Sequence, residues 1–218
     1  EQINRLLSTE STGVGPVINR FFSALQGAAD NPASVPAREV LLGESNSMAE
    51  RFNAIGQNFK DQNEVLSGQL KAMTNELNAL ASSVAELNGH IIFYRGDPTR
   101  EQPNDLLDQR DEMIRRMSEI TKVSVSEEDG LMNVFIGNGQ SMVQGLESSK
   151  LTVVNGVSDP SQVDIRFSNQ TSDILLTEQL KSGGQIGGTL NFRDESLNPA
   201  IASLGRLAMA VSSEMNNQ

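Results

Sequence analysis

Apolar residues repeat with a heptad spacing through the middle of the chain. From Leu66 to Ile91 the steps between them alternate between four and three residues, which is typical of a helix that buries one stripe along its length. The residues of this heptad seam are Leu66, Leu70, Met73, Leu77, Leu80, Val84, Leu87 and Ile91. Ser34 and Pro36 suit the start of this helix and the loop after Tyr94 suits its end, which predicts one rod of roughly 85 Å.

The remaining helical patterns are shorter. Upstream in the same helix the stripe continues through Met48, Phe52, Ile55 and Phe59. Polar Gln62 and Asn63 then interrupt it, which predicts a stutter or a kink. Three further stripes predict a first, a third and a last helix: Val17, Ile18, Phe21, Phe22, Leu25 and Ala29; Leu106, Leu107, Met113, Ile114, Met117 and Ile120; and Leu197, Ile201, Leu204, Ala208, Val211 and Met215. Because a long helix needs long partners to cover it, these stripes predict an elongated bundle.

The period of the pattern changes to two between the third and the last helix. The short β-type runs KVSVS, LMNVFI, LTVV and VDIRF are separated by the turn sequences EEDG, GNGQ, VNG and SDP, as in a small antiparallel sheet. The sequence therefore predicts a mainly α fold. Residues 1–121 and 192–218 form an elongated bundle of long helices, and residues 122–191 form a small antiparallel β subregion inserted before the last helix.

Composition narrows the classes of function. The chain has 218 residues, no cysteine and a formal net charge of −11, so disulfides and thiolate sites are excluded, and nucleic acid and anionic membranes are poor partners. No run of about 18 apolar residues is present to span a bilayer. The chain begins at Glu1 rather than methionine and its last residues are still in helical register, so we expect it to be a piece of a longer protein.

Motifs for chemistry are weak throughout. The single histidine, His90, lies on the flank of the long helix without a partner signature for a nucleophile. The glycine-rich stretches GNGQSM and GGQIGG lack the spacing of nucleotide-binding loops and are interpreted as turns. SEEDG lacks the ligand spacing of a calcium loop, and the glycosylation sequon at Asn169 is a short pattern. None of these motifs supports a catalytic residue, a cofactor or a metal site.

One stretch, NDLLDQRDEM from Asn104 to Met113, concentrates charge at the start of the third helix. Asn104 is a suitable N-cap and Asp105 lies where the helix dipole favours an anion. Two acid-first pairs, Asp111 with Arg115 and Glu112 with Arg116, have the i, i+4 spacing that stabilises helices. Every charge thus has an ordinary role in a helix.

A second interpretation of the same stretch concerns contact with other groups. Asp108 and Asp111 lie three residues apart on one helix face, a spacing that allows a carboxylate pair for acid–base work or for a metal. Arg110 beside them, with no histidine nearby, favours a polar face that contacts protein. Asp108, Arg110 and Asp111 are therefore predicted to form a protein-contact face, within the bundle or on a neighbouring subunit.

Five blocks, in order along nearly the whole chain, resemble one known family. They are FFSALQGAADNPASVPAREVLLGESNSMAERFN, ELNALASSVAELNGHI, NDLLDQRDEMIRRMSEI, MNVFIGNGQ and GGQIGGTLNFRDESLNPAIASLGRLAMAVSSEMNNQ. Together they are similar to flagellar hook-associated protein 1, the first protein of the bacterial hook–filament junction. Several collinear blocks are more specific than any short motif above.

The resemblance implies a structural subunit rather than an enzyme. Members of this family join hook to filament in a ring and support filament assembly and motility. They are secreted through the flagellum's own export apparatus, and they contact hook protein, neighbouring hook-associated proteins and copies of themselves in the extracellular flagellum. The long terminal helices that drive polymerisation in this family are absent from these 218 residues, which resemble its rod-like inner domain. We therefore expect this piece to stay monomeric.

Three other functions remain open on the sequence. The chain also fits another flagellar axial protein, such as flagellin or hook-associated protein 3, although the β subregion and the NDLLDQRD block favour the first protein. A carboxylate-dependent hydrolase would use Asp108 and Asp111. A surface adhesin would use the RGD tripeptide at residues 95–97.

Overall fold

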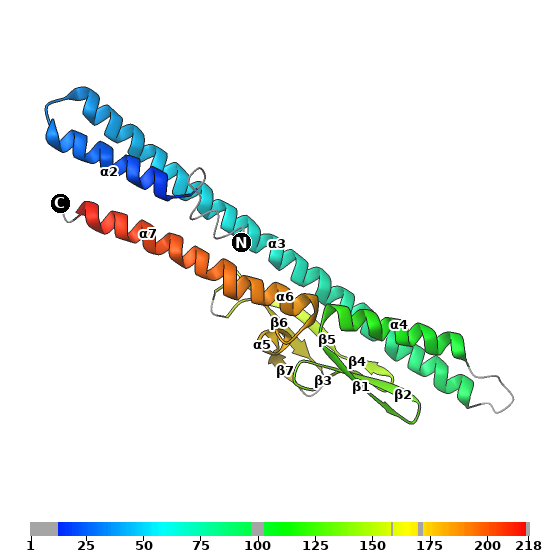
Figure 1. The fold of residues 1–218 in the computed structure, drawn as a ribbon. Coiled ribbons are helices and arrows are strands. Elements are labelled where there is room, and N and C mark those ends of the chain that lie inside the picture. The colour runs from blue at the N-terminus through cyan, green and yellow to red at the C-terminus, as the bar shows by residue number, and fades with distance from the viewer. Residues whose placement is uncertain (1–12, 97–102, 158, 170–171, 217–218) are drawn as a thin grey trace. The chain divides into compact units, whose positions relative to one another are not determined.

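The computed structural model describes residues 13–96, 103–157, 159–169 and 172–216 (Figure 1). Its helices are α2 (Gly15–Asp30), α3 (Val35–Arg95), α4 (Asn104–Ile120), α5 (Thr177–Leu180), α6 (Gly184–Phe192) and α7 (Asn198–Asn216), with a π-helical segment η1 (Arg193–Leu197). Its strands are β1 (Val123–Glu128), β2 (Leu131–Ile136), β3 (Gln140–Gln144), β4 (Glu147–Ser148), β5 (Lys150–Asn155), β6 (Val163–Ser168) and β7 (Asp173–Leu175). The predicted fold class, mainly α with a small antiparallel β region before the last long helix, is confirmed.

Contacts divide the chain into two compact units. Unit 1 comprises the described parts of residues 1–63 and 193–218, and unit 2 comprises those of residues 64–192. This division differs from the predicted one, which placed residues 64–121 in the bundle and separated them from the β subregion. The reason is that the second part of α3, together with α4, shares one hydrophobic core with the strands.

In unit 1, α2 runs back along the first part of α3 as a helical pair (Figure 1). Arg20 of α2 donates a 3.1 Å hydrogen bond to Glu44 of α3. At the predicted start of α3, the Ser34 hydroxyl accepts a 3.4 Å hydrogen bond from the Ala37 N–H, which satisfies one donor of the first helical turn. The buried apolar residues of the unit include Val17, Phe21, Met48, Ile55, Phe59, Leu197, Leu204 and Val211.

The last helix buries only part of its predicted stripe. Leu197, Leu204 and Val211 are buried, whereas Ile201 and Met215 are 40% and 49% exposed. The stripe therefore alternates between buried and exposed positions along η1 and α7. A heptad pattern identifies which side of the helix is apolar, but it does not say how far a partner covers that side.

In unit 2, the heptad seam of α3 lies against the core. Six of its eight residues are buried, and Met73 and Leu87 are half-buried. Leu70, Leu77 and Leu80 share the core with apolar residues of α4, α5, α6 and both sheets, namely Met117, Ile120, Val134, Ile136, Met142, Leu151, Ile165, Phe167, Leu176, Leu180, Ile186 and Leu190. The α3 helix is continuous through Gln62 and Asn63, and the boundary between the two units falls directly after these residues.

The β region consists of two antiparallel sheets. The first has the strand order β1-β2-β3-β4 and the second has the order β5-β6-β7. The β1–β2 turn contains the predicted Asp-Gly pair, where Asp129 and Gly130 have φ values of 51° and 81°. Positive φ at both central residues is what a two-residue hairpin turn of type I′ requires, and glycine adopts it without strain.

The GGQIGG stretch corrects one expectation. It was interpreted as a turn, but α6 begins at Gly184, so Gly187 and Gly188 lie inside a helix. Gly184 has a φ of 71°, and a Cβ there would lie 2.5 Å from the Thr121 Cα at the end of α4. A Cβ on Gly187 would lie 3.0 Å from the Leu180 carbonyl oxygen. These glycines therefore allow close approach of backbones rather than one long turn.

Candidate protein-contact face on α4

The charged stretch that begins α4 is divided between two sides of the helix. Asp108 and Asp111 are exposed, whereas Arg110 is buried on the side that carries Met117 and Ile120. The structure therefore does not place the three predicted contact residues on one face. The carboxylates point outward, and the guanidinium contacts protein inside unit 2.

The start of α4 also differs from the predicted cap. The helix begins at Asn104 itself, with Pro103 at the N-cap position and no side-chain cap hydrogen bond. The Pro103 carbonyl accepts hydrogen bonds from the N–H groups of Leu106 and Leu107 at 3.0 and 3.1 Å, so the helix starts one residue earlier than a cap at Asn104 requires. Asp105 lies in the first turn, where the helix dipole favours its charge.

Arg110 is a buried cation whose guanidinium bonds to polar groups of α3 and of the β1–β2 turn. Arg110 is 3% exposed. The Nη1 atom donates to the Asn88 Oδ1 of α3 at 3.4 Å and to the Gly130 carbonyl of the β1–β2 turn at 3.3 Å. Among the residues that the structure describes, the nearest carboxylate oxygen is that of Asp111, 3.9 Å from Nε, and the Asp111 side chain is 68% exposed. Arg110 thus links α4 to α3 and to a hairpin.

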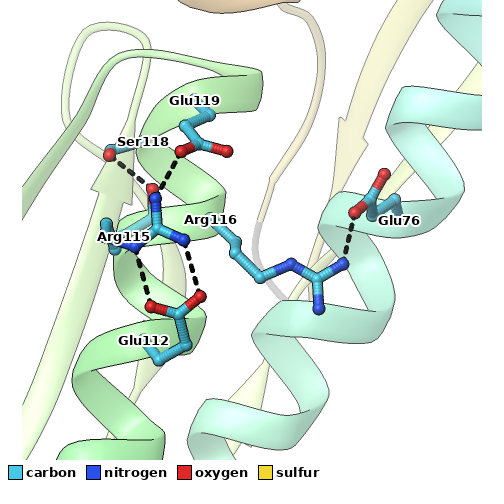
Figure 2. Close-up of polar contacts among 6 residues, drawn as sticks. All are labelled: Glu76, Glu112, Arg115, Arg116, Ser118 and Glu119. Atoms are coloured by element: carbon cyan, nitrogen blue, oxygen red, sulfur yellow. Dashed lines mark hydrogen bonds and ion pairs between the residues drawn. The ribbon is translucent and has the colours of Figure 1, made fainter.

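The outer side of α4 carries a ladder of ion pairs that differs from the predicted pairing (Figure 2). Arg115 lies between Glu112 and Glu119, with its Nη2 2.6 Å from Glu112 and its Nη1 on Glu119. Arg116 reaches across to Glu76 of α3 at 2.7 Å. The predicted partners were Asp111 for Arg115 and Glu112 for Arg116. Acids on either side along the helix compete for one arginine, so sequence spacing alone does not select the pair.

This ladder has an electrostatic consequence. The side-chain hydrogen bond from Arg115, with its positive charge, holds the pKa of Glu112 below its ordinary value, while Glu112 and Glu119 raise the pKa of Arg115. Both partners are well exposed, so water and salt screen the interaction and its contribution to stability is small.

The two candidate sites for chemistry, His90 and the Asp108–Asp111 pair, are open to solvent. His90 is exposed and lines a shallow hollow with Gln109 and Met113 of α4. Asp108 and Asp111 are also exposed, whereas catalytic groups work best where water is excluded. Within the described ranges, no group of three or more histidine, aspartate and glutamate side chains is placed to hold a metal ion.

The short surface motifs are described only in part. Of the RGD tripeptide, residue 97 lies outside the described residues, as do residues 170 and 171 of the sequon that begins at Asn169. In the described helices, no segment is both long and apolar enough to cross a membrane.

Sequence reasoning missed two polar residues of α3, Asn78 and Asn88. Both bond to strand backbone, and Asn88 is fully buried. Asparagine is a poor helix former, so its presence beside a heptad seam was the available signal.

Comparisons with known proteins cover the whole chain. The family model "Flagellar hook-associated protein FlgK helical domain" matches residues 1–218. The chain is 32% identical over its full length to "Flagellar hook-associated protein 1" of Escherichia coli K12, of which it covers 40%. It is 28% identical over 76% of its length to the protein of the same name in Bacillus subtilis, of which it covers 33%. The chain therefore spans about 40% or less of the length of these relatives.

A solved structure agrees with these matches. It is that of the flagellar hook junction protein FlgK from Burkholderia pseudomallei, which superposes on 99% of this chain with a TM-score of 0.89 and 32% sequence identity. The match covers 39% of that protein. At this identity and TM-score, the likeness extends to the sequence as well as to the fold.

Proposed function

The chain belongs to the FlgK family of flagellar hook-associated proteins, and on that premise we propose that it serves as the helical domain of a structural subunit that joins hook to filament. The observation that carries this proposal is the match of the family model to residues 1–218. Among flagellar axial proteins, the relatives point to hook-associated protein 1 rather than to flagellin or hook-associated protein 3.

The family is a structural component of the flagellum. We propose that the whole protein acts without enzymatic chemistry, that it is secreted through the flagellar export apparatus, and that its partners are hook protein, neighbouring hook-associated proteins and further copies of itself. The charged residues of α4 support a non-enzymatic role, because Glu112, Arg115 and Arg116 are engaged in ion pairs. Such pairs stabilise and orient a surface without requiring a substrate.

The outer side of α4 is our candidate for contact with a neighbouring subunit. Asp108 and Asp111 are exposed on it and have no ion pair shorter than 3.9 Å among the described residues. Carboxylates in this setting favour a partner surface with basic or hydrogen-bond-donating groups. Because such contacts at the rim of an interface are weak individually, they suit a joint between two lattices whose subunits must adjust.

The test uses the whole natural protein in flagellated cells. Asp108→Asn combined with Asp111→Asn removes both charges and keeps the side-chain shape. We expect normal export and normal folding, but filaments that detach more readily under shear. The control is Glu50→Gln with Glu64→Gln, which removes the same charge from exposed positions of α3 and should leave attachment unchanged.

Two results would contradict the proposal. Filaments attached as firmly as those of the parent would show that Asp108 and Asp111 make no contact on which filament attachment depends. If the purified wild-type chain hydrolysed a glycan, peptide or phosphate ester, and the double variant lost that activity with its fold intact, the two carboxylates would be catalytic instead.

A further inference from the structure

Two asparagines of α3 bond to strand backbone in the same way. The Asn78 Nδ2 donates to the Leu151 carbonyl at 2.8 Å, and the Leu151 N–H donates back to the Asn78 Oδ1 at 2.8 Å. The Asn88 Nδ2 donates to the Met132 carbonyl at 2.9 Å, and the Met132 N–H donates to the Asn88 Oδ1 at 3.1 Å. We call each two-bond arrangement an amide bracket, because one side-chain amide holds both polar groups of one strand residue.

Each bracket lies at a strand edge that no neighbouring strand pairs with at that position. Leu151 belongs to β5, which is the edge of its sheet, and pairs with Phe167 of β6 on its other side. Met132 pairs with Glu127 of β1, whereas β3 pairs with β2 only from Val134 onward. A strand residue directs its N–H and C=O toward the same edge in an antiparallel ladder. The asparagine amide therefore takes the place of a neighbouring strand at both points.

The brackets differ from the apolar contacts of the same helix in being directional. Burial of apolar area is non-directional. Seam residues such as Leu77 and Leu80 therefore favour packing of the sheets on the helix, but they do not determine at which position along the helix a strand lies. A hydrogen bond weakens steeply when its angle changes. A slip of either sheet by one residue would leave the amide facing no matching donor and acceptor pair.

We infer that Asn78 and Asn88 fix the register of the two sheets on α3, one bracket for each sheet. The two residues are ten positions apart in sequence, which is about 15 Å along a helix. Two fixed points at this separation determine the position of the β region along α3. Asn78 and Asn88 thus determine the register of the packing, while the apolar residues supply most of its stability.

The competing explanation is that the amides only satisfy backbone groups that water would otherwise satisfy. Asn88 is fully buried and also bonds to the Gly145 carbonyl and to Arg110, so its removal disturbs several elements at once. Asn78 is half-buried, and the hydrogen bonds described for it are the two of its bracket. Asn78 is therefore the position at which the two explanations are best separated.

The experiment measures register directly in the 218-residue chain. The sequence has no cysteine, so Ser82→Cys on α3 and Thr152→Cys on β5, both exposed positions, accept one spin label each. Double electron–electron resonance should give one narrow distribution of the distance between the two labels in the parent. Asn78→Ala should broaden or shift it, and should speed hydrogen exchange at the Leu151 amide by at least about tenfold, since an unpaired buried group weakens local structure by that order.

Two further variants make the result decisive. Asn75→Ala changes an exposed asparagine one turn away on the same helix and should leave both measurements as in the parent. Asn78→Asp keeps the acceptor for the Leu151 N–H but loses the donor, so it should broaden the distribution even if Asn78→Ala does not fold. An unchanged distance distribution in the folded Asn78 variants would overturn the inference, whether or not exchange at Leu151 accelerates.

Discussion

Asn88→Ala is the most informative single change for the stability of unit 2. Asn88 uses its full hydrogen-bonding capacity: Nδ2 donates to the Met132 and Gly145 carbonyls, and Oδ1 accepts from the Met132 N–H and from Arg110. It does so with no exposed surface. Truncation to alanine leaves three backbone groups of the strand region without their partner.

The magnitude follows from those three groups. An unpaired buried donor or acceptor costs about 1–3 kcal/mol, and relaxation or entry of water reduces the sum. The bond from Arg110, at 3.4 Å, is long and adds little. Alanine is a better helix former by roughly 0.7 kcal/mol, which offsets part of the loss. We therefore expect unfolding to become easier by about 3–4 kcal/mol, or roughly 10 °C in Tm for a chain of this length.

The assay is urea unfolding followed by far-ultraviolet circular dichroism, with the midpoint and slope fitted separately for each transition. Separate fitting is needed because contacts divide the chain into two units, which need not unfold together. Asn75→Ala is the control, since it makes the same change at an exposed position of the same helix. Equal unfolding free energies for the two variants would refute the role assigned to the buried amide.

Two other predictions concern the seam and the ion-pair ladder. Leu80 is 4% exposed within the core of unit 2, so Leu80→Asp should destabilise the chain by at least about 3 kcal/mol in thermal unfolding; an unchanged Tm would show that the seam awaits another partner. Because Arg115 lowers the pKa of Glu112 from 4.5, this pair contributes stability that is present above the unfolded-state pKa and is lost as pH falls through the folded-state pKa. A carboxyl titration by NMR should show the lowered pKa in the parent and a return toward 4.5 in Arg115→Met, whereas identical titrations would exclude the pair in solution.

Periodicity accounts for the parts of the fold that the sequence predicted well. The stripe from Leu66 to Ile91 specifies a helix face because apolar burial repeats with the helical turn, and the alternating runs specify strands for the same reason with a period of two. Periodicity says nothing about which elements share a core. Residues 64–121 were assigned to the helical bundle for that reason, although they pack with the sheets.

The positions of polar side chains were harder to predict, because neighbours distant in sequence decide them. Arg110 lies between two exposed aspartates, and nothing in NDLLDQRDEM indicates that it turns inward toward Asn88, 22 residues away. Similarly, Arg116 forms an ion pair with Glu76, 40 residues away, rather than with an acid on its own helix. Local spacing gives possible pairs, and tertiary contacts select among them.

The guanidinium of Arg110 is buried although burial of a cation is unfavourable. The nearest carboxylate among the described residues, on Asp111, is 3.9 Å from Nε and largely exposed. No described acid therefore neutralises the charge at close range, and burial of a charge opposes folding. Its directional contacts are with the Asn88 Oδ1 and the carbonyl of Gly130. An apolar residue of the same size would fill the space and avoid the desolvation cost, but it would leave α4 without a directional link to Asn88. At 3.4 and 3.3 Å these two contacts are long, so they orient α4 against α3 and the β1–β2 turn but contribute little free energy.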